Sequence, residues 1–362
     1  MPSPLRAKVT RRGFIKNLCL VCGALLLKGC APVEELTEVE YQDTPVWEPA
    51  YKKLEAEGKF TERILQAYAV MEKCELCPRR CGVNRLEGEI GFCRAPKDAV
   101  VSTYSPHLGE ELPLVGRTGS GTIFFAHCNL RCVFCQNWPI AIEGRGNEAT
   151  PEAIAAMMLS LQKIGCHNIN LVTPTHVMPN ILKATQLALQ SGLNLPLVYN
   201  TSGYERVEMI KLLDGIVDLY LPDLKFMDGA QAEIYNHAAA YDYPKRAQAA
   251  IIEMHRQVGD LVMDEAGIAR RGLMVRHLVM PNRVASTRDF VHWVAENLST
   301  DTYVNIMSQY RVEYKAFEYE DIARSITPEE FIEAIEWAFE AGLTNLDERS
   351  LSRYDINLLD RN

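Results

Sequence analysis

The stretch "GTIFFAHCNLRCVFC", residues 121–135, joins a run of β-branched and aromatic residues to three closely spaced cysteines. The run 122–126 follows the turn-forming "RTGSG" and is typical of a β-strand. Farther along, "TPEAIAAMMLSLQKIG" begins with Thr150 as a helix N-cap and Pro151 at the first helical position. The cysteines therefore lie on a loop between a strand and a helix. In a fold built from βα units, such a loop opens at the end of the sheet where active sites form.

The spacing of these cysteines, which we call the three-cysteine loop, indicates a metal cluster with one open position. Cys128, Cys132 and Cys135 are separated by three and then two residues, and no fourth cysteine lies nearby. Three thiolates can bind three irons of a [4Fe–4S] cluster, which leaves the fourth iron free for another molecule. A closed electron-transfer cluster has four ligands, whereas a site that binds a substrate keeps one position open. The alternatives are a chance cysteine loop and a zinc site completed by a distant histidine.

A second group of cysteines, the four-cysteine motif, precedes this loop in "CELCPRRCGVNRLEGEIGFC", residues 74–93. Pro78 and three glycines favour the turns that bring sulfur atoms together. Four thiolates at close spacing can complete a zinc site or hold an iron–sulfur cluster, and we favour the cluster because of the three-cysteine loop downstream. Two disulfides in an exported protein, or reduced structural thiols, are the alternatives. The expected ligands of this second metal centre are Cys74, Cys77, Cys81 and Cys93.

The composition is that of a globular protein that is not expected to bind nucleic acid. Of its 362 residues, 48% are hydrophobic, and the formal net charge of −9 disfavours contact with a nucleic-acid backbone. The eleven cysteines are an odd number, which argues against a framework made only of disulfides. Their clustering favours metal ligation instead.

The first 33 residues have the character of an export signal. They contain no acidic residue, and the paired arginines of "TRRGFIK", 10–16, precede the apolar run "LCLVCGALLL", 18–27. This pattern indicates the twin-arginine route. The apolar run is too short to span a bilayer, which needs about 20 residues. "LKGC", ending at Cys30, loosely resembles a lipoprotein cleavage box and therefore a lipid anchor, and a disordered basic leader is the alternative.

The rest of the chain predicts an α/β fold with a largely parallel sheet. Helical segments separate most of the predicted strands, as in a series of βα units. The segment "DLVMDEAGIARRGLMV", 260–275, predicts a hairpin that turns at 264–267. The last helix starts at "TPEE", where Thr327 and Glu330 form a capping box. The strands are expected at residues 122–126, 168–172, 197–200, 217–221, 273–280 and 303–307.

The order of these features divides the chain into five segments. Before the cysteines, "PAYKKLEAEGKFTERILQAYAVMEK" has apolar residues at helical spacing. We therefore expect a leader at 1–33, a linker with one or two helices at 34–70, a four-cysteine segment at 71–118, a core at 119–348 and a C-terminal tail at 349–362.

The three-cysteine loop, with Phe134 before its last cysteine, resembles that of the radical S-adenosylmethionine (SAM) superfamily. The likeness covers about residues 70–348. It implies a partial (β/α)6 barrel of the radical SAM type, preceded by an N-terminal cysteine-rich segment, and this agrees with the six predicted strands. Six further segments resemble the pyruvate formate-lyase activating enzyme-like branch, namely "CELCPRRCGVNR", "GCHNINLVTPTH", "PLVYNTSGYE", "DLYLPDLKFMD", "RGLMVRHLVMPN" and "TYVNIMSQYR".

The resemblance implies a specific chemistry. SAM would bind the open iron through its amino and carboxylate groups, and the reduced cluster would pass one electron to the sulfonium. The carbon–sulfur bond then breaks and leaves a 5′-deoxyadenosyl radical, which abstracts a hydrogen atom from a substrate. Cys128, Cys132 and Cys135 would serve this catalysis as the cluster ligands.

The ends of the later strands are expected to supply the contacts to SAM. "VTPTH" departs from the family, since Thr173, Pro174 and Thr175 stand where related activating enzymes have Gly-Gly-Glu. Each of the three groups of contacts has an alternative. "NTSGY" could be a polar turn without a ligand, "DLK" a surface ion pair, and "LMVRHLVM" a strand whose charge pairs with a protein carboxylate. The expected contacts are Asn200 and Ser202 in "NTSGY", Asp223 and Lys225 in "DLK", and Arg276 and His277 in "LMVRHLVM".

Two classes of function agree with these features. A radical SAM enzyme, with glycyl-radical activation of a partner protein as one form, needs an open iron, whereas a non-catalytic iron–sulfur electron-transfer protein does not. The interval 136–149 lacks the ferredoxin-like cysteines often found in activases. We expect a low-potential electron donor of the flavodoxin or ferredoxin type and no nucleic acid as partner, and leave a protein substrate as one alternative. Because SAM and such electrons are cytoplasmic supplies, we expect cytoplasmic function, with twin-arginine export and a lipid anchor at Cys30 as the alternative.

Overall fold

The computed structural model describes residues 47–237 and 240–352. The twin-arginine leader, the proposed anchor at Cys30 and most of the C-terminal tail lie outside the described residues. Two helices, α2 (Ala50–Ala56) and α3 (Phe60–Ala69), occupy the described part of the predicted linker, as expected. Across the described ranges, no helix is both long and apolar enough to cross a membrane.

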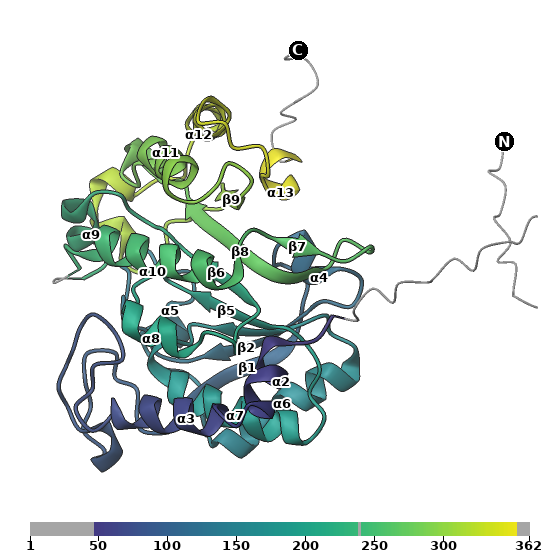
Figure 1. Ribbon diagram of the computed structural model, residues 1–362. Helices are drawn as coiled ribbons and strands as arrows, with labels where there is room; N and C mark the ends of the chain where they lie inside the picture. Colours follow the sequence, from purple (N-terminus) through teal and green to yellow (C-terminus); the bar gives the residue numbers. More distant parts are fainter. Residues whose placement is uncertain (1–46, 238–239, 353–362) are drawn as a thin grey trace, which may run out of the picture. The chain divides into compact units, whose positions relative to one another are not determined.

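A parallel sheet forms the centre of the described chain, as the sequence predicts (Figure 1). Its strands are rich in Ile, Leu, Val and Tyr and are largely buried, as is typical of parallel strands covered on both faces. Each of the six strands named in the next sentence is parallel to the one that follows it there. The strands are β2 (Ser120–Phe125), β4 (Ile169–Val172), β5 (Leu197–Thr201), β6 (Leu219–Pro222), β8 (Ala269–Leu278) and β9 (Tyr303–Met307).

The sheet is an open α/β barrel with additional antiparallel strands. β1 (Ala99–His107) pairs with β2, and β3 (Asn147–Ala149) pairs with β1, so the sheet extends into the segment 71–118, where no strand was predicted. The predicted hairpin is confirmed, because β7 (Val262–Met263) is antiparallel to β8. Among the described strands, β9 pairs only with β8, and the barrel is therefore not closed.

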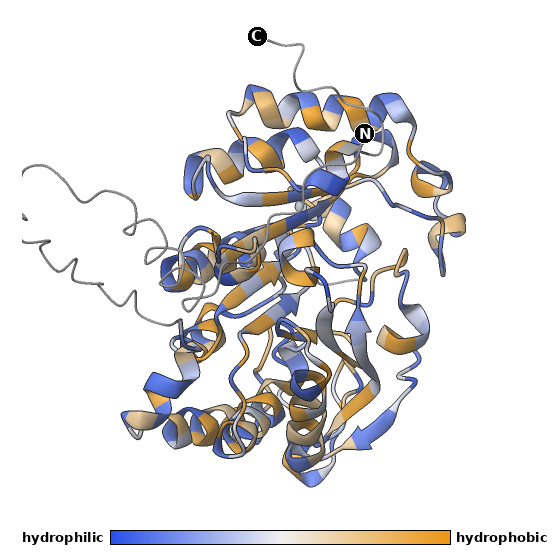
Figure 2. Cartoon of the chain, turned by 90° about the vertical axis from the view of Figure 1, so that its right-hand side faces the viewer, coloured by the Kyte–Doolittle hydropathy of each residue, from blue (hydrophilic) through white to orange (hydrophobic). Residues whose placement is uncertain are grey.

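Helices cover the outer face of the sheet, and their starts follow the predicted caps. α6 (Pro151–Ile164) begins after Thr150, whose hydroxyl accepts the Ala153 amide. α12 (Pro328–Glu340) begins with the predicted capping box. Figure 2 shows hydrophobic and hydrophilic residues alternating along the helices, as expected for helices that bury one face. The other long helices are α7 (Met178–Gln190), α10 (Tyr243–Val258) and α11 (Thr287–Asn297).

A short helix between β1 and β2 fills the inner side of the barrel. This helix, α4 (Leu112–Val115), places Leu114 among inward-facing residues of four strands. The side-chain amide of Asn168 donates to the Leu114 carbonyl at 2.8 Å. Because Asn168 directly precedes β4, this bond anchors the helix to the start of that strand. The inner face is therefore closed by apolar contacts at one end, and the polar residues of the same strands face the other end. The residues around Leu114 are Val198, Leu219, Leu221, Ala269, Met274 and Tyr303.

Candidate active site

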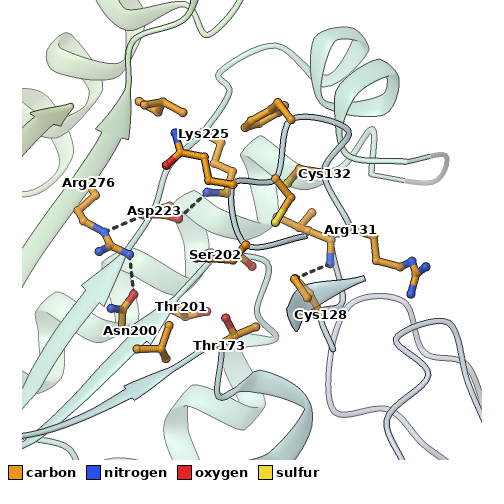
Figure 3. A pocket seen from close by; sticks show the side chains of 18 of the residues that line it. Cys128, Arg131, Cys132, Thr173, Asn200, Thr201, Ser202, Asp223, Lys225 and Arg276 are labelled. Carbon is orange, nitrogen blue, oxygen red and sulfur yellow. Dashed lines mark hydrogen bonds and ion pairs between the residues drawn. The ribbon is translucent and has the colours of Figure 1, made fainter. Parts of the chain in front are cut away.

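A cavity of about 230 Å³ lies at the carboxyl ends of the parallel strands. It brings together the three-cysteine loop and polar side chains that end three different strands (Figure 3). This is the end of the sheet at which βα loops place catalytic groups. Of the predicted site residues, the cavity is lined by Cys128, Cys132, Cys135, Asn200, Ser202, Asp223, Lys225 and Arg276.

The three-cysteine loop is held in an unusual backbone conformation. His127 and Arg131 have positive φ angles of 73° and 59°, which cost side-chain-bearing residues about 1–3 kcal/mol each and therefore need support from their surroundings. The Val133 amide supplies part of this support by donating to the Tyr235 carbonyl at 2.9 Å. All three thiols are free of disulfides, and the Leu130 amide donates to Cys128 Sγ at 3.4 Å.

Burial keeps the thiols of Cys132 and Cys135 protonated in the absence of a metal. It raises the pKa of Cys135 to about 12 and raises the pKa of Cys132 as well, although the Lys225 ammonium acts in the opposite direction on both. A bound metal deprotonates its thiol ligands outright and so reverses this preference. Among the described residues, no group of three or more His, Cys, Asp or Glu side chains is arranged to hold a single metal ion. A [4Fe–4S] cluster does not need such a group, because each cysteine binds a separate iron.

A charged network crosses the cavity floor. Asp223 receives Arg276 Nε at 2.9 Å on one oxygen and Lys225 Nζ at 2.5 Å on the other. Arg276 also donates to Asn200 Oδ1 at 2.5 Å. Burial opposes ionisation of Asp223, but the two cations outweigh it and hold its pKa below the usual value. The network therefore keeps a carboxylate and two cations ionised beside the cysteines.

Close packing of the chain fixes this network in place. Gly203, the glycine of "NTSGY", has a φ of 79°, and a Cβ there would lie 2.2 Å from the Asp223 carbonyl oxygen. The backbone therefore approaches Asp223 too closely at this position for a residue with a side chain. The Ser202 hydroxyl beside it is buried and has no hydrogen-bond partner in the described residues. A bound ligand would supply such a partner, because buried polar groups are normally hydrogen-bonded.

His277 lies on the opposite face of β8 from Arg276. Its ring stacks on Phe290 of α11 with centroids 4.3 Å apart, and its nitrogens contact the Leu224 carbonyl and the Thr287 hydroxyl. Consecutive residues of a strand point to opposite faces, so these two neighbours cannot both reach the cavity. The structure therefore brings Arg276, and not His277, to the other predicted contacts.

Two acidic residues below the network were missed by the sequence analysis. Glu110 approaches Arg276 at 3.7 Å and His107 at 2.9 Å, and Glu111 accepts Asn305 Nδ2 at 2.8 Å. The other carboxylate oxygen of Glu111 is buried and has no hydrogen-bond partner within residues 47–237 and 240–352. Both line a second cavity of about 310 Å³, which shares Met307 and Gln309 with the first. The sequence does contain a signal for these two residues, because Glu110 and Glu111 are adjacent acids within the otherwise largely apolar segment "HLGEELPL", 107–114.

The two threonines of "VTPTH", the segment that departs from the family pattern, have different surroundings. Thr173, with a φ of 61°, lines the cavity, whereas Thr175 donates to the buried carboxylate of Glu205 at 2.5 Å. Thr201 donates to the same oxygen at 2.5 Å. Because these partners are neutral hydroxyls, burial dominates and raises the pKa of Glu205 to about 7.

We expect Glu205→Gln to change how stability depends on pH. The unfolded carboxyl ionises near 4.5, while the folded one keeps its proton up to about 7. Wild-type stability should therefore fall by about 3 kcal/mol as the pH rises through this window, and the glutamine variant should lack this loss. Urea unfolding at pH 5 and pH 8 measures the effect. A difference between the two proteins that is equal at both pH values would show that Glu205 is already ionised when folded.

The four-cysteine motif lies outside the cavity. Cys74 and Cys93 are buried, Cys77 and Cys81 are half-buried, and none of the four forms a disulfide. The alternative of two disulfides is therefore absent from the structure. Cys166 is a separate buried thiol at the start of β4.

Comparisons with known proteins agree with this geometry. The sequence model of the Radical SAM superfamily matches residues 122–259. The uncharacterized protein MJ0674 of Methanocaldococcus jannaschii is 38% identical over 279 residues, which are 74% of this chain and 75% of that protein. MJ0808 of the same organism is 25% identical over 268 residues, 67% of this chain and 72% of that protein.

Among solved structures, the crystal structure of methylornithine synthase (PylB) is similar with a TM-score of 0.39 and 16% sequence identity. The match covers 59% of this chain and 60% of that chain, so this protein spans about three fifths of that structure. The family match includes the three-cysteine loop and the strand ends that carry Asn200, Ser202, Asp223 and Lys225. The chain belongs to the radical SAM superfamily.

Proposed function

We propose that this radical SAM enzyme cleaves SAM reductively in the cavity beside the three-cysteine loop and uses the 5′-deoxyadenosyl radical to abstract a hydrogen atom from a substrate. The single observation that supports this most is the cavity itself, in which the three thiols meet five of the predicted polar residues from three strand ends. A non-catalytic electron-transfer protein would need neither a missing fourth ligand nor such a cavity.

The residues present fit a [4Fe–4S] cluster and SAM. The loop offers three free thiols, and the cavity next to them contains the buried, unpartnered hydroxyl of Ser202. When bound, the cluster supplies the electron that breaks a carbon–sulfur bond of SAM. Cys128, Cys132 and Cys135 would hold it through three irons, and the polar residues of the cavity would hold SAM.

The protein's own contribution is to bind and orient the methionine and ribose groups. Arg276 and Lys225 line the cavity as cations, and we propose that they receive the SAM carboxylate. Asp223 bridges the two and fixes their positions. Asn200 and Ser202 offer an amide and a hydroxyl for hydrogen bonds to neutral polar groups. Thr175 is not proposed as a contact to the SAM amino group, because its hydroxyl donates to Glu205.

The decisive experiment measures 5′-deoxyadenosine after the reconstituted protein is reduced with dithionite and mixed with SAM. We expect 5′-deoxyadenosine in a reaction that depends on both reductant and iron. Cluster reduction with no 5′-deoxyadenosine, over many hours and at saturating SAM, would instead identify an electron-transfer protein.

Ser202→Ala is expected to weaken SAM binding by about fivefold, because one hydrogen bond contributes about 1 kcal/mol net. Equilibrium binding of SAM to the reconstituted protein measures this change. Ser120→Ala is the matched control, since that buried hydroxyl donates to Asn168 Oδ1 at 2.6 Å at the far end of β2. Its loss should lower stability and leave the affinity for SAM unchanged. Equal affinities for all three proteins would remove Ser202 from the binding site.

The finer features of function stay predictions. These are a glycyl-radical activase activity, a protein substrate, an electron donor of the flavodoxin or ferredoxin type, and a cytoplasmic location. The printed name of the structural neighbour describes methylornithine synthesis by that protein, and the likeness in fold carries no substrate to this chain.

A further inference from the structure

We propose that the four-cysteine motif holds an iron–sulfur cluster that relays electrons to the three-cysteine loop through Arg79. The proposal rests on the proposed function, because only reductive cleavage of SAM requires electrons at that loop. It assigns the motif an iron–sulfur cluster, where the sequence alone left zinc open, and adds a direction of electron flow and the residue that connects the two sites.

The motif gathers its four sulfur atoms by tight turns. The Cys74 amide donates to the Val83 carbonyl at 2.8 Å, and the Gly82 amide returns to the Cys74 carbonyl at 3.0 Å. Gly91 lies so close to Cys81 that a Cβ there would be 3.0 Å from its sulfur. Cys77 lies within electrostatic range of the other three cysteines. Four free thiols so placed are a complete ligand set for a cluster.

Backbone amides point at the sulfurs of this motif. The Phe92 amide donates to the sulfur of Cys81 at 3.3 Å. The backbone amides of Arg79 and Ala95 also favour the anionic forms of Cys77 and Cys93, respectively. Hydrogen bonds to cysteine sulfurs stabilise their anionic form and tune the potential of a cluster.

The three-cysteine loop uses the same local geometry. The Leu130 amide donates to Cys128 Sγ at 3.4 Å, and the backbone amide of Asn137 favours the anionic form of Cys135. In this loop the superfamily binds a [4Fe–4S] cluster. Amides near sulfur stabilise thiolates around zinc as well as iron, but zinc cannot carry electrons, so the contact of this motif with the three-cysteine loop is what favours an iron–sulfur cluster.

Arg79 connects the two cysteine groups directly. It follows Cys77 by two residues, and its Nε donates to the carbonyl of Asn129, the residue after Cys128, at 3.0 Å. Its guanidinium lies 3.9 Å from the centroid of the Phe92 ring, next to Cys93 in sequence. From the other side, the Arg131 guanidinium lies 6.0 Å from the same ring.

Figure 3 shows the Arg131 side chain extending from the three-cysteine loop on the side away from Asp223 and Lys225. Part of the motif is accessible to solvent, because Arg80 and Glu89 are exposed and Ile90 is 51% exposed. One electron from a reduced donor of the flavodoxin or ferredoxin type would enter the motif here and leave it for the three-cysteine loop. The relay is then unchanged after each transfer, and no bond in it forms or breaks.

The metal content tests the first half of the proposal. Reconstituted wild-type protein is expected to bind about eight irons with matching sulfide, and Cys77→Ala/Cys81→Ala about four. Cys166→Ala, which removes a buried thiol outside both groups, should keep the wild-type iron. About four irons with one zinc in the wild type, or equal iron in the wild type and the double variant, would overturn the assignment.

Arg79→Ala tests the relay, with Arg80→Ala as its control because the neighbouring side chain is exposed. We expect both variants to keep the wild-type iron content. Reduced flavodoxin should produce the SAM-sensitive electron paramagnetic resonance signal of the three-cysteine loop in the wild type and in Arg80→Ala. This signal should be lost in Arg79→Ala on the same time scale, while dithionite still produces it.

The failure of the relay and the failure of the proposed function give different results. If the flavodoxin-driven signal rises equally fast in Arg79→Ala, in the double cysteine variant and in the wild type, the relay is refuted while SAM cleavage stands. If wild-type protein forms no 5′-deoxyadenosine even with dithionite, the proposed function itself is refuted, and the iron content then decides the second cluster alone.

Discussion

Alanine in place of Cys128 is expected to abolish the formation of 5′-deoxyadenosine by the reduced, reconstituted protein. In the proposed assignment each thiolate of the loop binds one iron and the fourth iron has no protein ligand, so the loss of one more ligand would leave the cluster held at two corners. The loop has no substitute ligand, since the other cysteines of the cavity lining, Cys132 and Cys135, already belong to the set. The same loss is therefore expected for Cys132→Ala and Cys135→Ala.

Iron content and 5′-deoxyadenosine should be measured together on each variant. Under the proposed assignment both fall, whereas Cys166→Ala keeps both because that thiol lies away from the cavity. Circular dichroism shows whether each variant is folded, which separates loss of the cluster from loss of the protein. A triple variant without any of the three thiols that still formed 5′-deoxyadenosine would end the radical SAM interpretation of this loop.

Arg276→Met is expected to lower the free energy of unfolding by about 3–5 kcal/mol, because it removes the buried cation that Asp223 and Glu110 share. Asp223 accepts Arg276 Nε at 2.9 Å, and Glu110 lies 3.7 Å from its Nη1. Burial opposes ionisation of both carboxyls, yet Arg276, with Lys225 beside Asp223 and His107 beside Glu110, holds both pKa values below the usual range. Methionine preserves the volume of the side chain and removes only the charge and its hydrogen bonds.

The loss caused by Arg276→Met should depend on pH in a defined direction. The stability that comes from the lowered carboxyl pKa values is present above the unfolded values of 3.8 for Asp223 and 4.5 for Glu110, and it is lost as the pH falls through the folded values. Without the guanidinium, burial should raise the pKa of both carboxyls and let them take up protons as the pH falls. The difference between the variant and the wild type should therefore be larger at pH 8 than at pH 5 when measured by urea unfolding.

Arg270→Met is the matched control on the same strand. Arg270 pairs with Asp264 at 2.8 Å, and both side chains are partly exposed, so this pair should contribute less than about 1 kcal/mol. Comparable losses for the two variants, or a loss for Arg276→Met that is the same at both pH values, would contradict the role assigned to the buried network.

The sequence by itself determined the parts of this protein that depend on local signals. Runs of β-branched and aromatic residues marked the parallel strands from β2 to β9, and Thr150 and Thr327 marked the starts of α6 and α12. The cysteine spacing marked the three-cysteine loop, because ligands of one cluster must lie close together in the chain or on one turn. These features are set by neighbouring residues; the structure confirms the elements and places eight of the predicted site residues around one cavity.

Only the tertiary structure decided which face each strand residue uses and which distant segments meet. The strand that carries Arg276 and His277 is buried on both faces, so its pattern gives no inward side, and contact with α11 assigns His277 to the outer one. Glu110 reaches Arg276 because α4 enters the barrel, and Arg79 reaches Asn129 across a separation of 50 residues. Such contacts depend on how packed elements approach each other, and no local signal in the sequence encodes that geometry.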